Sequence, residues 1–173
     1  MNTTHFFATV KTVAEVKQLY RTLAMQHHPD RGGDTATMQE VNRQYKIALQ
    51  KCDGQTTVDH ETKREHTYKY NTEHEQAVID FIDKLIRSGV LTANVDAWLI
   101  GIWVWIQGDT KPIKDKLKEL GCMWHSKRLC WYWHPPQEGK TRYNSRVGLD
   151  GIARTYGASK IARQQHEENA LAA

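Results

Sequence analysis

Two stretches near the start of the chain repeat apolar residues at intervals of three and four, and a short polar segment separates them. Residues at this spacing fall on one side of an α-helix, so each stretch predicts an amphipathic helix. The apolar positions are Val13, Val16, Tyr20 and Leu23 in the first stretch, and Met38, Val41, Tyr45, Ala48 and Cys52 in the second. We expect the two helices to pack face to face as a hairpin.

The polar segment at residues 27–34 has the composition of a tight reversal. A residue before proline is pushed out of the helical region, so the first helix should end near His27. The two glycines that follow permit the chain to turn back. Either Asp34 or Thr37 has the side chain needed to cap the second helix.

The stretch YRTLAMQHHPDR at residues 20–31 resembles the second helix and the signature loop of the J-domain, the module of DnaJ-type co-chaperones. The resemblance covers residues 5–52, and its specificity comes from the His-Pro-Asp triplet lying between two helix patterns. It implies that this part of the chain binds a DnaK-type ATPase chaperone, of the seventy-kilodalton heat-shock class, and stimulates its ATP hydrolysis.

Carried over by position, the stimulating loop consists of His28, Pro29 and Asp30, whose side chains we expect to point outward at the tip of the hairpin. Lys17 and Arg21 are four residues apart and so share a helical face, which the resemblance assigns to a basic surface that meets the acidic chaperone. The alternative is an ordinary helical hairpin, in which the triplet is a turn and the two basic side chains are a solvated face.

The chain departs from the complete DnaJ architecture in several respects. Its segment before the second J-domain helix is short, and no fourth helix pattern follows Cys52. The glycine- and phenylalanine-rich linker and the repeated CxxCxGxG zinc module of full-length DnaJ proteins are missing from the sequence. We therefore expect a J-domain that is joined to a different kind of module.

Charge and composition narrow the class of protein. Residues 53–95 are acidic and separate two basic segments, residues 1–52 and 96–149. The sequence has no apolar run long enough to span a bilayer, so we expect no membrane contact. It has no secretory signal, and its three cysteines suit a reducing compartment, so we expect a cytoplasmic protein. It has no catalytic motif, so we expect neither an enzyme nor a cofactor. The compact architecture is typical of a bacterial or phage protein.

The acidic segment divides into two parts. Residues 53–71 are polar and without pattern, which indicates a linker or a weakly ordered helix. Residues 73–88 predict a connecting helix that ends at Gly89. Its inward positions are Val78, Phe81, Ile82 and Leu85.

All six tryptophans lie in residues 97–134, where we expect a β-α-β-β unit. Residues 98–106 are apolar and rich in β-branched and aromatic side chains, which predicts one strand with Trp98 on the face opposite Trp103 and Trp105. A helix capped by Asp109 or Thr110 should follow over residues 110–120, and then a hairpin over residues 122–134.

The tryptophan-rich unit has more aromatic side chains than one core face absorbs, and it is rich in lysine. Aromatic stacking beside positive charge suits single-stranded nucleic acid. The candidate residues are Trp103, Trp105, Lys114, Lys118, Lys127, Arg128, Trp131 and Trp133. The alternatives are that the tryptophans fill a small core while the lysines solubilise it, or that the tryptophan face receives a peptide. Residues 96–136 also resemble HARP-like modules and tryptophan-rich modules of phage and mobile-element proteins.

A zinc site is a further candidate in the same region. Cys122, His125, Cys130 and His134 have the spacing C-x2-H-x4-C-x3-H, which is close to that of a zinc knuckle. The alternative is that a helix and a hairpin account for the segment without metal.

Together these patterns predict a mostly α protein with a small α+β domain. The units are a J-domain at residues 1–52, a linker with connecting helix at 53–95, the tryptophan-rich domain at 96–140 and a tail with a terminal helix at 141–173. We expect a co-chaperone whose carboxy-terminal module directs the chaperone to a client or a nucleoprotein complex. The competing interpretation is a nucleic-acid-binding protein of a phage or mobile element, in which the J-like hairpin is only a scaffold.

Overall fold

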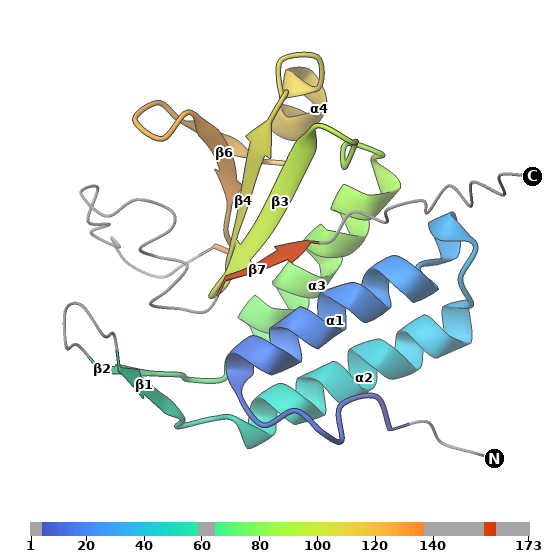
Figure 1. The fold of residues 1–173 in the computed structure, drawn as a ribbon, viewed down its shortest axis with the longest axis vertical. Coiled ribbons are helices and arrows are strands. Elements are labelled where there is room, and N and C mark those ends of the chain that lie inside the picture. The colour runs from blue at the N-terminus through green and yellow to red at the C-terminus, as the bar shows by residue number, and fades with distance from the viewer. Residues whose placement is uncertain (1–4, 59–64, 137–157, 162–173) are drawn as a thin grey trace, which may run out of the picture.

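The amino-terminal part of the chain is a helical hairpin, as the apolar spacing predicts. The computed structural model describes residues 5–58, 65–136 and 158–161. Its first two helices are α1 (Val13–His27) and α2 (Thr35–Lys51), which pack antiparallel (Figure 1). Thr12 and Glu15 form a capping box at the start of α1, while the Asp34 carboxylate accepts a hydrogen bond from the Thr37 backbone N–H at 2.7 Å. Of the two proposed caps of the second helix, Asp34 is therefore the one used.

The segment predicted as a linker or weakly ordered helix contains a short β-hairpin instead. Strands β1 (Thr56–Val58) and β2 (Glu65–Thr67) pair antiparallel. Their threonine and valine side chains favour extended backbone, and most of them are exposed. Three-residue strands are too short to show an alternating pattern in the sequence.

The connecting helix is confirmed. Helix α3 spans Thr72–Arg87 and begins at Asn71, whose side chain accepts a hydrogen bond from the His74 backbone N–H. Gly89, with φ of 67°, takes the left-handed conformation that ends it. Its four predicted inward positions are all buried. In Figure 1, α3 passes between the hairpin and the sheet.

The carboxy-terminal half of the described chain forms an antiparallel sheet with the strand order β5-β6-β4-β3-β7. The strands are β3 (Val95–Ile100), β4 (Trp103–Gly108), β5 (Met123–His125), β6 (Cys130–Trp133) and β7 (Ala158–Ile161). The short helix α4 (Lys114–Glu119) connects β4 to β5. The chain is therefore an α+β protein, and β7 contacts α1 as well as β3.

The prediction of one strand over residues 98–106 is wrong. The chain turns at Gly101, where φ is 61°, and β3 and β4 pair through the register Ile100 with Trp103 and Trp98 with Trp105. Glycine at the first position of a two-residue turn is the only sequence signal for this reversal. Because paired residues share a face, Trp98 lies on the same side of the sheet as Trp105, not opposite to it.

Two further predictions need correction. Helix α4 begins only at Lys114, and Ile113 stands at its cap position without a side-chain hydrogen bond, so neither Asp109 nor Thr110 caps it. In the tail predicted to hold a terminal helix, residues 158–161 are the strand β7. The rest of that tail lies outside the described residues.

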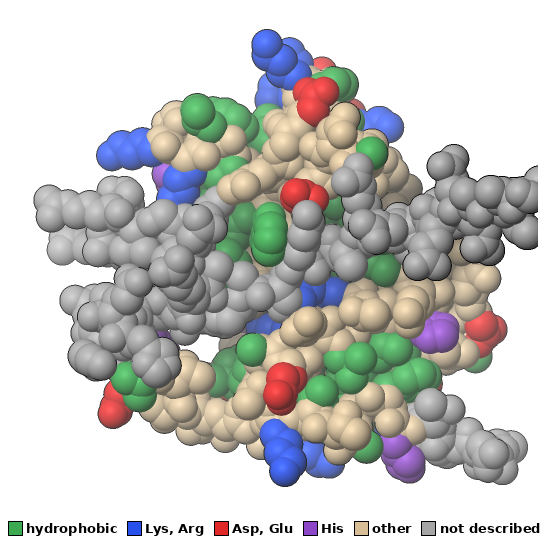
Figure 2. Space-filling model, viewed as in Figure 1, with side chains coloured by type: hydrophobic (Ala, Val, Ile, Leu, Met, Phe, Trp, Pro, Cys, Tyr) green, Lys and Arg blue, Asp and Glu red, His purple; other side chains and the backbone are tan. Residues whose placement is uncertain are grey.

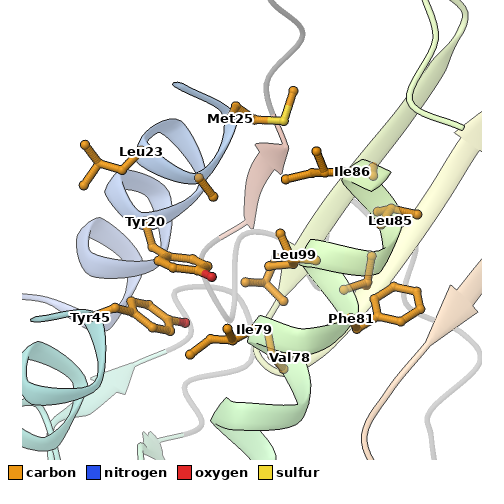
Figure 3. Packing of buried hydrophobic residues seen from close by; sticks show 14 of the residues in the cluster. Tyr20, Leu23, Met25, Tyr45, Val78, Ile79, Phe81, Leu85, Ile86 and Leu99 are labelled. Atoms are coloured by element: carbon orange, nitrogen blue, oxygen red, sulfur yellow. The ribbon is translucent and has the colours of Figure 1, made fainter. Parts of the chain in front are cut away.

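One hydrophobic core runs through the hairpin, α3 and the inner face of the sheet. The Tyr20 and Tyr45 rings stack with centroids 4.1 Å apart, and Figure 3 shows both in the same region as Ile79 of α3 and Leu99 of β3. On the other side of α3, Phe81 stacks on Trp133 with centroids 4.0 Å apart. The predicted helical and tryptophan-rich units therefore share α3 as a common layer. None of the helices that the structure describes has the length and apolar character needed to cross a bilayer.

Candidate functional site

The His-Pro-Asp triplet forms a compact turn at the tip of the α1–α2 hairpin. A single 3-10 turn spans Pro29–Arg31, and His28 is its cap: the His28 Nδ1 atom accepts a hydrogen bond from the Asp30 backbone N–H at 3.2 Å. The His28 carbonyl accepts a second bond from the Gly33 N–H at 3.0 Å. These local bonds hold the three residues of the triplet in one conformation.

His28 does not point outward, contrary to the expectation from the sequence. Its side chain is 0% exposed, and its Nε2 atom lies 2.9 Å from Oδ1 of Asp83 on α3. Because Nδ1 accepts from a backbone N–H, the ring proton belongs on Nε2, where it donates to the Asp83 carboxylate. The physical reason for the correction is that α3 returns along the hairpin and supplies both the cover and the hydrogen-bond partner.

Asp30 is the member of the triplet that reaches solvent. Its side chain is 45% exposed, and its Oδ2 atom lies 3.9 Å from Nε of Arg87, also on α3. Arg87 makes a closer ion pair, at 2.8 Å, with Oδ2 of Asp83. The loop carboxylate therefore faces an arginine of its own chain, while Pro29 is half-buried beside it.

Lys17 and Arg21 are not an exposed basic surface, which corrects the second part of the site prediction. Their side chains are buried, with 4% and 1% of each residue exposed. Burial lowers the pKa of Arg21 to about 9. The exposed positions of α1 are Ala14, Glu15, Gln18, Thr22 and Gln26, so its solvent face carries no lysine or arginine.

Lys17 belongs to a buried polar cluster that the sequence reading missed. Its Nζ atom lies 3.0 Å from Oε1 of Glu75 and 2.8 Å from the carbonyl oxygen of Gly101 in the β3–β4 turn. The hydroxyls of Tyr45 and Tyr68 donate to the same Glu75 carboxylate at 3.3 and 2.8 Å. Burial and the Glu75 charge raise the pKa of both tyrosines, which keeps them as donors. The sequence contained one indication of this cluster, because Glu75 falls in line with the apolar positions of α3.

The candidate nucleic-acid residues fall on two faces of the sheet. Trp103 and Trp105 lie on one face and stack with centroids 5.9 Å apart, whereas Trp131 and Trp133 belong to the opposite face, against the main core. Trp105 and Trp131 are buried, so the predicted set does not form one stacking surface.

The candidate cations, by contrast, are mostly accessible. Lys114, Lys118 and Lys127 are exposed, and Arg128 lies over the Trp105 ring at 5.3 Å. Figure 2 shows basic side chains gathered at the top of the molecule, where α4 lies. The exposed tryptophan of the chain is Trp124, at 47%, on the edge strand β5, and it was not among the candidates.

The zinc hypothesis is wrong, because the fold places its two cysteines on opposite faces of the sheet. Cys122 is part of the main core, whereas Cys130 packs with Trp105 on the other face of the sheet. The two thiols therefore cannot bind one ion, and burial raises the pKa of Cys122 to about 12, which disfavours the thiolate that zinc needs. Within the part of the chain that the structure describes, no group of histidine, cysteine and acidic side chains is arranged to hold a metal.

Comparisons with known proteins add no assignment. No family matches the chain, and neither a curated protein nor a solved structure matches it.

Proposed function

We propose that the chain is a J-domain co-chaperone, which contacts a DnaK-type ATPase chaperone through the hairpin tip and stimulates its ATP hydrolysis. The observation that carries the proposal is an antiparallel helical hairpin with a hydrogen-bonded His-Pro-Asp turn at its tip and the Asp30 carboxylate partly in solvent. The helical hairpin is the shape that the resemblance to J-domains implies. The tryptophan-rich sheet would then direct the chaperone to a client or a nucleoprotein complex.

Asp30 and His28 have separate roles in this proposal. Asp30 offers an acceptor that an arginine of the chaperone can engage in a charge-assisted hydrogen bond. His28 acts beneath it, because its ring nitrogen fixes the Asp30 backbone N–H. Lys17 joins α1 to α3 and to the β3–β4 turn, and Arg21 is buried on the same helix. Because both side chains are buried, the proposal no longer includes their electrostatic attraction to the acidic chaperone.

Asp30→Asn is the first test. Asparagine keeps the size of the side chain but removes its charge, so we expect stimulation of chaperone ATP turnover to fall by at least about tenfold, the equivalent of about 1.4 kcal/mol. Single-turnover ATP hydrolysis by the chaperone, measured against increasing concentrations of the full chain, gives the effect.

Asp109→Asn is the matched control, because Asp109 is an exposed aspartate at the far end of β4. Its variant should stimulate as the wild type does. Absence of stimulation by the wild type, or equal stimulation by wild type and Asp30→Asn, contradicts the co-chaperone proposal.

A second candidate function is single-stranded nucleic-acid binding, with the hairpin as a scaffold. The observation in its favour is that Lys17 and Arg21 are buried, while Trp124 is exposed on the same β5–β6 hairpin as the exposed Lys127. An exposed aromatic ring near a lysine can stack on a base while the lysine attracts a phosphate.

This candidate predicts salt-sensitive binding of a labelled single-stranded oligonucleotide, measured by fluorescence anisotropy. Trp124→Ala should weaken binding by about 1–3 kcal/mol, the usual contribution of one stacked base. Leu129→Ala, which removes another exposed apolar side chain of the hairpin, is the control and should bind as the wild type does. No binding at low salt rejects this function.

A further inference from the structure

We propose that the end of α3 is an intramolecular latch that pairs with the hairpin tip and limits its access to the chaperone. The inference rests on the proposed co-chaperone function and concerns the regulation of that same site. Asp83 pairs with the His28 ring, and Arg87 already lies 3.9 Å from the Asp30 carboxylate that a partner's arginine would engage.

The two latch residues are four positions apart, so they share a side of α3, and they pair with each other at 2.8 Å. Asp83 uses both carboxylate oxygens, one for His28 and the other for Arg87. A cation from a partner that binds the Oδ2 side of the Asp30 carboxylate competes there with Arg87. The chain thus supplies its own competitor for the contact that the proposed function requires.

The contacts between α3 and the hairpin tip are weak enough for the latch to open. The Arg87 side chain is 54% exposed, and its 3.9 Å approach to Asp30 is a loose ion pair that solvent screens. The His28–Asp83 bond is better protected, because the ring is fully buried. If the latch is open in about one molecule out of ten, only that fraction can bind the chaperone, and the apparent affinity is about tenfold lower than that of a tip without a latch.

Opening the latch leaves the hydrophobic core intact. Phe81, Ile82 and Leu85 of α3 are buried in that core, whereas Asp83 and Arg87 are partly exposed. The latch can therefore be removed by substitution at partly exposed positions while the helix stays packed. This separation makes the proposal accessible to mutation.

The test uses the full chain with Asp83→Ala and Arg87→Ala combined. We expect the concentration that gives half-maximal stimulation of chaperone ATP turnover to fall by about fivefold or more, because the open fraction rises. Lys84→Ala is the matched control, since Lys84 is an exposed cation on the same helix and makes no latch contact among the described residues. Arg87→Lys keeps the charge beside Asp83 and should behave nearly as the wild type.

A second measurement reports on the latch without the chaperone. Amide hydrogen exchange of residues 30–33 should accelerate by about fivefold or more in the double variant and stay unchanged in Lys84→Ala. Adding Asp30→Asn to the double variant should abolish the gain in stimulation.

The outcomes separate the two proposals. Unchanged exchange and unchanged stimulation in the double variant overturn the latch and leave the co-chaperone function standing. Accelerated exchange without stimulation by any form of the chain overturns the co-chaperone function, and the regulatory role falls with it. A triple variant that stimulates as strongly as the double variant also overturns the latch, because the gain would then not pass through Asp30.

Discussion

Replacing Glu75 by alanine is expected to lower the free energy of unfolding by about 3–5 kcal/mol, the usual cost of breaking a buried ion pair from one side. The carboxylate accepts from the Lys17 ammonium and from the hydroxyls of Tyr45 and Tyr68, and all four side chains meet between α1, α2 and α3. Without it, the two hydroxyls lose their acceptor, and the Lys17 ammonium loses its counter-charge and keeps only the Gly101 carbonyl as a hydrogen-bond acceptor. Urea denaturation followed by circular dichroism measures the change.

Two variants make this prediction specific. Glu73→Ala removes an exposed glutamate from the first turn of the same helix and should cost less than about 1 kcal/mol. Lys17→Met combined with Glu75→Leu removes both charges, so it should recover much of the stability lost in Glu75→Ala. A loss below about 1 kcal/mol in Glu75→Ala would show that the cluster does not stabilise the fold.

The helical half of the fold could be predicted because its signals are local. The apolar spacing of residues 13–23 and 38–52, the proline after His28 and the glycine after Ser88 each fix a boundary within a few residues. All three long helices were expected from such signals. The same reasoning identified the β5–β6 hairpin.

The environment of Lys17 could not be predicted, because its partners are distant in the sequence. Glu75 lies 58 residues away and Gly101 lies 84 residues away. Glu75 falls in line with the apolar positions of α3, but local spacing does not pair it with Lys17. A lysine next to an apolar stripe is usually a solvated residue. The packing of α3 and of the β3–β4 turn against α1 places Lys17 in the interior.

The same limitation explains the error at residues 98–106. An uninterrupted apolar run gives one long strand or two short buried ones with equal ease, and Gly101 alone marks the difference. Once the run folds back on itself, Trp98 moves to the face of Trp105. Trp131 and Trp133 belong to the opposite face, where Trp133 stacks on Phe81 of α3. The residues proposed to bind nucleic acid are therefore divided between the two faces of the sheet.

The second large effect is expected at the hairpin tip, where Gly33→Ala should lower the free energy of unfolding by about 3 kcal/mol. A Cβ atom at this position would overlap the backbone carbonyl group of His27, so the last turn of α1 or the loop must move. Such a movement disturbs the Gly33 N–H bond to the His28 carbonyl and the position of the buried ring. Urea denaturation measures the loss, and stimulation of chaperone ATP turnover should fall with it.

Gly32→Ala is the matched control, because at Gly32 alanine is disfavoured by the backbone conformation and not by steric overlap. Its φ of 85° is left-handed, but a Cβ atom there meets nothing within 4 Å, so the cost should be about 1–2 kcal/mol from backbone strain alone. The two adjacent substitutions thus separate strain from steric overlap in one loop. If Gly33→Ala is as mild as Gly32→Ala, the loop is not packed closely against the end of α1.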